Sequence, residues 1–357
     1  LPISPAARAL PSGAGEGEAV TDRRPAVNIV NITGRALFAP HFDPVRDGYD
    51  LVENGSPDRE WDLLAVFEAL PAPAIYRVRA GGSLFISGEP PEIGGHAFAF
   101  LQQFDAVFCA GARADAAASV SHEQHFNNWH FGYSAARAGY RYSHATIRDL
   151  PLPEKKATLS TVTSNLNYLP MHIRRRALID RLTRDYAGRI DIFGRPHRFV
   201  EYKEDAILPY RFHLCVENCA VPGLWTEKIA DALLSYAVPV YAGCPNIESY
   251  FPGATLAIDL EDYVSARRAI DTILQDGEAL YRSRLDAIVA ARRRLIEDFD
   301  ISALIRDRLR QLDADSMRTV ALVPEDQLPF ARVRDLLLRA RRRARTIAWR
   351  RRVARHG

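Results

Sequence analysis

Three consecutive residues in the middle of the 357-residue chain, Thr226, Glu227 and Lys228, have the types expected of a phosphate-binding helix start. Thr226 is a good N-cap for the helix predicted at residues 226–237. The free N–H groups and the positive dipole end of a helix favour a bound phosphate. Because the dipole disfavours lysine in a first turn, contact with a diphosphate would explain Lys228, and a carboxylate such as Glu227 suits a ribose diol. An ordinary capped surface helix is the alternative.

A polar pair precedes this helix. Glu217 and Asn218 directly follow residues 211–216, which are predicted to form a buried strand. Ligands of open α/β sheets bind outside the carboxyl ends of the strands. We therefore expect Glu217 and Asn218 to lie near the helix start at Thr226.

A longer ordered pattern contains these residues and resembles the signature of glycosyltransferase family 10, the α-1,3-fucosyltransferase family. The pattern runs Tyr210-Arg-Phe-x-Leu-x-x-Glu-Asn218, then Thr226-Glu-Lys228, then Val238-Pro-Val-Tyr-x-Gly243. Two upstream pieces look similar to the same family: Ser164-Asn165 with Arg175 and Leu182, leading to Asp191-Ile-Phe-Gly194, and Ser87-Gly88-Glu89-Pro90. The resemblance covers roughly residues 80–265 and is more specific in the second half of the chain.

The resemblance implies a GT-B fold, with two Rossmann-like lobes facing a central cleft, and GDP-fucose as the donor substrate, bound mainly by the second lobe. Arg175 and Lys228 would hold the diphosphate, since a fixed guanidinium and a point charge both suit phosphate oxygens. Glu227 would bind the ribose, and Glu217 and Asn218 would line the donor pocket with Thr226. No tightly bound cofactor is implied.

The same resemblance implies an inverting reaction, which needs one general base to deprotonate the acceptor hydroxyl. Glu89 matches the position of that base, and Glu92 is a second choice. Partial burial at a strand end would raise the pKa of Glu89 and suit it to this role. A glutamate on the surface of a turn is the alternative.

One position departs from the family pattern. The family usually has Tyr two residues before the Thr of Thr-Glu-Lys, and this chain has Leu224 there. Losing that hydroxyl removes one hydrogen bond to the donor, worth about 1 kcal/mol. A transferase of the same fold that uses another nucleotide sugar is therefore a second hypothesis.

The elements that must position these residues alternate between strands and helices, which predicts parallel βαβ units in two lobes. Strands are expected at residues 27–32, 74–79, 84–87, 105–109, 158–163, 189–193, 211–216, 238–242 and 255–259. Helices are expected at residues 61–70, 95–103, 173–186 and 226–237, with a charged helical region at 265–316. The predicted organisation is a disordered leader at 1–24, an acceptor-binding lobe at 25–152, a donor-binding lobe at 153–330 and a basic helical tail at 331–357.

An aromatic and histidine-rich segment in the first lobe is a candidate acceptor-binding loop. Within it, His125, Asn127 and Trp129 are the side chains that could stack on a sugar or bond its hydroxyls, and ordinary packing is the alternative. The histidine spacing there does not fit a zinc site. Asp298-Phe-Asp300 and Asp313-Ala-Asp315 have the Asp-x-Asp form of metal-dependent transferases, but they fall in charged helical stretches. We expect them on a solvated face and expect no catalytic metal.

The tail holds eleven Arg and one Asp, a net charge of +10, so the other 330 residues carry a net charge of −7. Apolar residues at helical spacing with Arg on the other faces predict contact with an anionic membrane surface. A solvated tail and a nucleic-acid-binding protein are the alternatives, although no nucleic-acid module is visible. The absence of a long apolar segment predicts a cytoplasmic protein. We expect it to act in surface polysaccharide or glycolipid synthesis, with a peripheral location on the inner face of the membrane as a further option.

Overall fold

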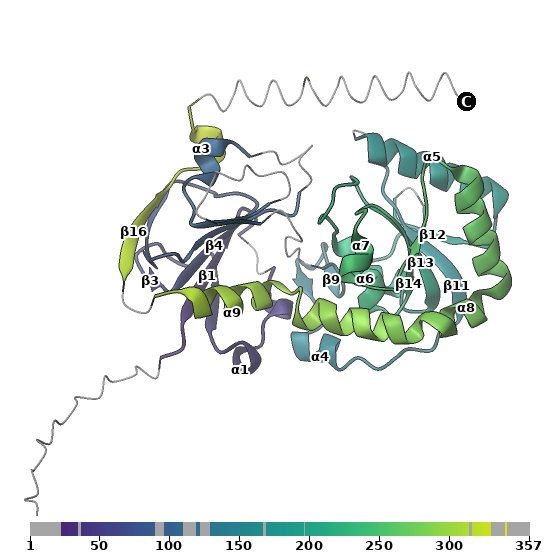
Figure 1. Ribbon diagram of the computed structural model, residues 1–357, viewed down its shortest axis with the longest axis horizontal. Coiled ribbons are helices and arrows are strands. Elements are labelled where there is room, and N and C mark those ends of the chain that lie inside the picture. Colours follow the sequence, from purple (N-terminus) through teal and green to yellow (C-terminus); the bar gives the residue numbers. More distant parts are fainter. Residues whose placement is uncertain are drawn as a thin grey trace, which may run out of the picture.

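The computed structural model describes residues 23–34, 37–89, 96–109, 119–121, 129–166, 169–195, 197–313, 316–329 and 340. Almost all of the predicted leader and tail therefore lie outside the described residues. The described chain forms two lobes, each built on a parallel β-sheet with helices packed against it (Figure 1). This is the GT-B arrangement that the family resemblance implied.

The sheet of the first lobe is buried on both faces. Alternate residues of its strands enter two hydrophobic clusters: Val27 and Ile29 lie in one, and Ala26 and Val30 lie in the other. Such strands read as continuous apolar runs, as parallel strands covered on both sides do. Six parallel strands lie side by side in the order β2 (Asp50–Glu53), β1 (Ala26–Asn31), β4 (Leu63–Phe67), β6 (Ser83–Ile86), β7 (Ala106–Phe108) and β8 (Ser119–Ser121).

The sheet of the second lobe contains the signature strands. Its five parallel strands follow the order β12 (Asp191–Phe193), β11 (Ala157–Val162), β13 (Tyr210–Val216), β14 (Val238–Ala242) and β15 (Leu256–Ala257). One large hydrophobic cluster joins them to the helices of the lobe. These helices are α4 (His144–Arg148), α5 (Pro170–Asp185), α6 (Glu227–Leu234), α7 (Ile247–Tyr250) and α8 (Tyr263–Glu297).

The remaining elements are short or cross between the lobes. They are the helices α1 (Pro44–Asp47), α3 (Phe98–Leu101) and α9 (Ile301–Gln311), the 3-10 helices η1 (Ala39–His41), η2 (Lys203–Ala206) and η3 (Glu325–Gln327), a hairpin of β9 (Tyr133–Ser134) and β10 (Gly139–Tyr140), and a small sheet of β3 (Glu60–Trp61), β5 (Ala74–Arg79) and β16 (Met317–Leu322).

Both lobe boundaries differ from the sequence prediction. After α8 the chain returns to the first lobe: Ile301, Leu304 and Ile305 of α9 pack against its sheet, and β16 pairs antiparallel with β5. The second lobe therefore ends near Glu297, not at residue 330. Conversely, residues 129–147 contribute to the core of the second lobe, although they were assigned to the first. Helical periodicity shows which face of a helix is apolar but not which sheet it covers.

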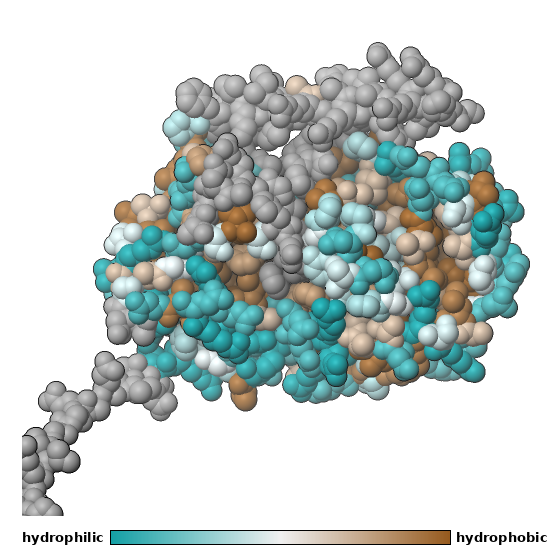
Figure 2. All heavy atoms as spheres, viewed as in Figure 1, coloured by the Kyte–Doolittle hydropathy of each residue, from teal (hydrophilic) through white to brown (hydrophobic). Residues whose placement is uncertain are grey.

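The part of the molecule where the lobes meet has a polar outer surface. In Figure 1, α9 and α8 run in line along the lower edge of both lobes. Figure 2 shows mostly hydrophilic spheres over the α9 part of this edge and a mixture of hydrophilic and hydrophobic spheres over the α8 part. The exposed charges Asp307 and Arg310 of α9 face solvent there, so α9 is an amphipathic connector whose apolar face holds the first lobe.

Two sequence predictions about local structure were wrong. Residues 61–70 were predicted to form a helix, yet they contain strand β4. All five β4 residues are buried, and a short apolar run of this kind carries no periodicity that separates strand from helix. Asp300 was expected on a solvated face, but it is 2% exposed and caps the N-terminus of α9.

Candidate active site

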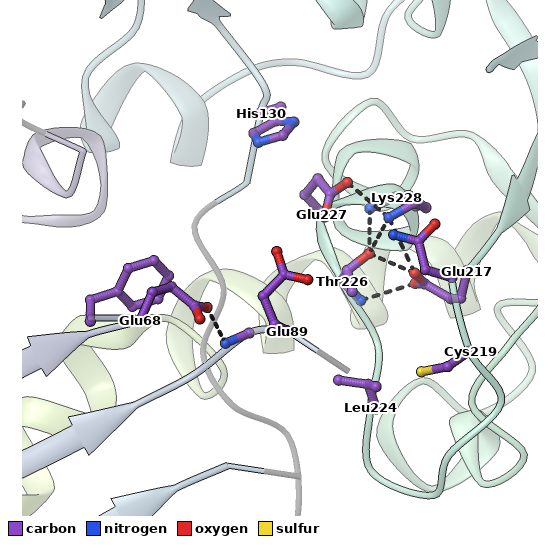
Figure 3. A pocket seen from close by; sticks show the side chains of 12 residues that line it. Glu68, Glu89, His130, Glu217, Cys219, Leu224, Thr226, Glu227 and Lys228 are labelled. Carbon is purple, nitrogen blue, oxygen red and sulfur yellow. Dashed lines mark hydrogen bonds and ion pairs between the residues drawn. The ribbon is translucent and has the colours of Figure 1, made fainter. Parts of the chain in front are cut away.

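A pocket of about 250 Å³ lies between the lobes and brings together residues from both. Its volume is near the lower end of the range for ligand sites, about 300 Å³. Figure 3 shows Glu68 and Glu89 reaching it from the first lobe, opposite Glu217, Thr226, Glu227 and Lys228 of the second. The other lining residues are Phe67, Gly88, His130, Asn218, Cys219 and Leu224.

Glu217 supports the start of α6. It is 1% exposed, and its carboxylate accepts hydrogen bonds from the backbone N–H of Thr226 at 2.9 Å and from the Thr226 hydroxyl at 2.6 Å. The Thr226 side chain in turn caps the helix by accepting from the Lys228 N–H. Glu217 thus fixes the helix N-terminus beside the pocket, a role that its position after a strand did not reveal.

Lys228 and Glu227, in the first turn of α6, form an ion pair. The Lys228 Nζ lies 3.0 Å from Glu227 Oε1 and 3.5 Å from Glu217 Oε2. Burial acts to raise the pKa of Glu227. Lys228, His130 and Lys203 lower it by a larger amount, so the pKa of Glu227 lies below its usual range. Burial likewise acts to lower the pKa of Lys228, and the two carboxylates raise it above its usual value. Both groups are charged at neutral pH, as phosphate and ribose contacts require.

Arg175 adds a second cation on the same side. It is 7% exposed and projects from α5, with its guanidinium donating to Asn218 Oδ1 at 3.2 Å and to the Ser164 hydroxyl at 3.1 Å. Arg175 and Lys228 also line one small adjoining cavity. The structure therefore places side by side the two cations that the resemblance assigned to a diphosphate.

Glu89 stands on the opposite wall. It follows β6 and is exposed, so the burial that we expected to raise its pKa is absent in this structure. Glu68, which follows the neighbouring strand β4, is instead half-buried. Burial raises the pKa of Glu68 to about 7, and the charge of Glu89 contributes in the same direction.

The sequence analysis missed Glu68. The signal was present, since a carboxylate directly after a buried strand lies at the ligand-binding edge of a parallel sheet. The incorrect helix prediction for residues 61–70 hid that strand end. With β4 beside β6 in the sheet, Glu68 and Glu89 necessarily emerge next to each other.

Of the three predicted acceptor-binding residues, the structure describes Trp129 alone. His125 and Asn127 lie outside the described residues. Trp129 is 1% exposed, and its ring lies 4.0 Å from that of His41, so it packs in the core and does not face the pocket. Its neighbour His130 lines the pocket instead. The backbone N–H groups of His130 and Phe131 donate to Asp231 of α6 at 2.9 and 3.0 Å, which fixes His130 relative to Glu227.

Within the described ranges, no group of three or more His, Cys, Asp or Glu side chains is arranged to hold a metal ion. In the same ranges, no helix is both long and apolar enough to cross a membrane. The four cysteines all lie in the described part of the chain, where they are buried and form no disulfide.

A two-lobed α/β fold, with a carboxylate of one lobe facing cations at a helix start of the other, is an arrangement of the GT-B type. Comparison with known proteins finds a family model that matches part of the chain. Residues 152–284 match the model described as glycosyltransferase family 10 (fucosyltransferase), C-terminal part. The second lobe is therefore similar to the C-terminal part of that family, in the region where the signature lies.

Curated relatives also match part of the chain. The α-(1,3)-fucosyltransferase FucT of Helicobacter pylori is 31% identical over 131 residues, which are 36% of this chain and 26% of the relative. The α-(1,3)-fucosyltransferase B of Drosophila melanogaster is 32% identical over 76 residues, or 21% of this chain and 17% of the relative. The matched part thus spans about a quarter or less of these proteins.

Solved structures are similar over more of the chain at lower identity. A crystal structure of α1,3-fucosyltransferase with GDP-fucose has a TM-score of 0.46 and 19% identity, covering 79% of this chain and 94% of that one. A UDP-forming α,α-trehalose-phosphate synthase from Burkholderia vietnamiensis has a TM-score of 0.42 and 12% identity, covering 70% and 67%.

Proposed function

We propose that this protein is an inverting glycosyltransferase that moves fucose from GDP-fucose to a hydroxyl of a saccharide acceptor. The observation that carries the proposal is the composition of one pocket. Glu89 lines it from the first lobe, and Glu227 and Lys228 line it from a second lobe that matches the fucosyltransferase family. The base and the leaving-group cations of a displacement reaction thus face each other across the space where a sugar would lie.

In the proposed reaction, Glu89 takes the proton of the acceptor hydroxyl while the hydroxyl oxygen attacks the anomeric carbon of the donor sugar. The bond from that carbon to the diphosphate breaks, and its electron pair leaves with GDP. Attack from the side opposite GDP inverts the anomeric centre. Lys228, Arg175 and the positive end of the α6 dipole stabilise the negative charge that develops on the diphosphate. Glu227 binds the ribose, and Asn218 orients Arg175.

The wider setting is also part of the proposal. We assign the acceptor to a surface polysaccharide or glycolipid made on the cytoplasmic side of a membrane, with residues 331–357 contacting anionic lipid. The net charge of +10 in those residues supports the lipid contact. They lie outside the described residues, apart from residue 340.

Isothermal titration with GDP, GDP-fucose, GDP-mannose and UDP tests the donor assignment. We expect micromolar binding of GDP and GDP-fucose by the natural chain. Lys228→Ala should weaken GDP binding about 10- to 100-fold, because a hydrogen bond to a charged group contributes about 1.5–3 kcal/mol. Arg175→Lys should also weaken it, since a lysine cannot make the bidentate contact of an arginine.

Lys156→Ala is the matched control, because Lys156 is exposed and pairs only with the exposed Glu154 among the ion pairs of the described chain. It should bind GDP as the natural chain does. Tighter binding of UDP than of GDP would reject fucose and favour the second nucleotide-sugar hypothesis. Unchanged GDP affinity in Lys228→Ala would reject the site.

A further inference from the structure

Glu68 occupies an unusual backbone conformation at the edge of the pocket. It directly follows β4 and has φ of 64°, in the left-handed region that residues other than glycine rarely adopt. Such a conformation is strained and persists where surrounding contacts fix it. A glycine would adopt it without that strain, so the carboxylate at this position calls for a reason.

The contacts of Glu68 supply one. One carboxylate oxygen accepts the backbone N–H of Gly88, and the other accepts the hydroxyl of Ser87 at 3.0 Å. The Ser87 oxygen in turn accepts the backbone N–H of Glu89 at 3.3 Å. Glu68 therefore holds the entire turn that presents Glu89 to the pocket, and Ser87 is fully buried between them.

Backbone hydrogen bonds between neighbouring strands also fix the turn at residues 87–89. The backbone N–H of Glu68 donates to the carbonyl of Ile86 at 2.9 Å, which ties the end of β4 to the end of β6. The N–H of Ser87 donates to the carbonyl of Phe108 on the next strand at 2.9 Å. The turn at residues 87–89 is thus anchored on both sides, and the Glu68 carboxylate closes its open side.

We propose that Glu68 is the positioning residue for Glu89: its carboxylate holds the turn at residues 87–89 so that Glu89 faces the pocket, and its negative charge helps Glu89 to accept the acceptor's proton. This inference rests on the proposed function, because it gives Glu68 its role through the base of that reaction.

The proposed effect of the Glu68 charge follows from the closeness of two carboxylates, those of Glu68 and Glu89. Each like charge disfavours ionisation of the other, so an ionised Glu68 makes protonated Glu89 more favourable. Glu89 acts on Glu68 in the same way, since burial and the charge of Glu89 both raise the pKa of Glu68. The other groups facing Glu68 are His96, which acts to lower its pKa, and the buried thiol of Cys109. His96 also pairs with Glu325 at 2.9 Å.

The test compares Glu68→Ala, Glu68→Gln and Ser87→Ala with the natural chain. The assay follows GDP release from GDP-fucose with water as the acceptor, at pH 5 to 9, so that no saccharide acceptor has to be known. Titration with GDP is run on every protein. Glu60→Gln is the matched control, because Glu60 is exposed and its side chain pairs with the exposed Arg77.

We expect Glu68→Ala to lower kcat at least tenfold while GDP affinity stays within twofold. Glu68→Gln should restore kcat to within about threefold, since an amide carbonyl can still accept from Gly88 and the amide NH₂ can donate to Ser87. Its acidic limb in the pH profile should move to lower pH, because the natural chain loses the charge of Glu68 as the pH falls through about 7, whereas the amide has no charge to lose. Ser87→Ala should lower kcat without moving that limb, which keeps the test informative if Glu68→Ala does not fold.

Three results would overturn the inference. The first is natural kcat and an unchanged pH profile in Glu68→Ala and Ser87→Ala. The second is an equal loss in Glu68→Ala and Glu68→Gln with the acidic limb in place, which would mean that the turn is not held as described. The third is a natural chain that neither binds GDP nor releases it from GDP-fucose, which rejects the proposed function itself and is recognised before any variant is compared.

Discussion

Gly243 shows how one small residue permits the geometry of the donor side. A Cβ atom at this position would lie 2.7 Å from Cβ of Glu217 and 2.7 Å from the Tyr241 hydroxyl. These distances are shorter than real Cβ contacts, and Glu217 is the carboxylate that holds the start of α6. The glycine at the end of the signature is therefore explained by space and not by backbone conformation.

We expect Gly243→Ala to displace Glu217 and, through it, Thr226. Overpacking of this kind costs about 1–3 kcal/mol of stability, and GDP affinity should fall with it because the helix start moves. Thermal unfolding and GDP titration measure the two effects. Gly139→Ala is the control, since its added Cβ would meet only the Arg137 carbonyl at 3.8 Å. GDP affinity equal to that of the natural chain would mean that Glu217 does not position α6 for the ligand.

The start of helix α6 could be predicted well from the sequence. Its N-cap, its acidic first turn and its buried apolar face are all local features, and they place the start of the helix within one residue. What local features cannot supply is the partner of the cap. The bond from Thr226 to Glu217 joins a helix to a neighbouring strand end, and only the folded sheet brings them together.

The α6 cap makes a prediction at the scale of an element. Thr226→Val keeps the shape of the side chain but removes the hydroxyl, which caps the helix and donates to Glu217. We expect a loss of about 1–3 kcal/mol of stability, because a cap is lost and a buried carboxylate loses a donor. Thr226→Ser retains the hydroxyl and should lose much less. Equal unfolding midpoints in urea for the two variants would contradict the cap's role.

In the first lobe too, an element with a local sequence pattern could be predicted and an element without one could not. The strand at residues 74–79 has its bounds correct, since charged residues alternate with apolar ones there. Strand β4 was mistaken for a helix because burial on both faces removes that alternation. Because β4 was missed, Glu68 was missed too, and with it one of the two first-lobe carboxylates that line the pocket. The donor residues were predictable because they follow an ordered pattern within a short stretch.

At the scale of the whole molecule, a buried cluster of charged and polar groups joins the lobes. Asp300, at the start of α9, lies 3.0 Å from His41 Nδ1 of the first lobe and 3.8 Å from His144 Nε2 of α4. Helix α4 packs into the second lobe through Ile147. Arg46 of α1 contacts both His144 and Asp300. The connection between the lobes thus depends on side chains that must keep their protonation states in the interior.

His144 makes this connection sensitive to acid. Burial lowers the pKa of His144 to about 4, with Asp300 acting against this and Arg46 adding to it. In the unfolded chain a histidine takes up its proton near pH 6.5. The folded state resists that proton, so the stability that neutral His144 contributes is complete above about pH 6.5 and is lost as the pH falls towards 4. At pH 5 the loss should be about 2 kcal/mol.

His144→Gln removes the titrating group, so its free energy of unfolding should fall less than that of the natural chain between pH 7.5 and pH 5. Urea unfolding at the two pH values measures the difference directly. The exposed His197 provides the control, because His197→Gln should follow the natural chain. Parallel pH dependence in the natural chain and His144→Gln would mean that His144 binds its proton equally well in the folded and unfolded chains. Acid would then not loosen the contact between the lobes through this residue.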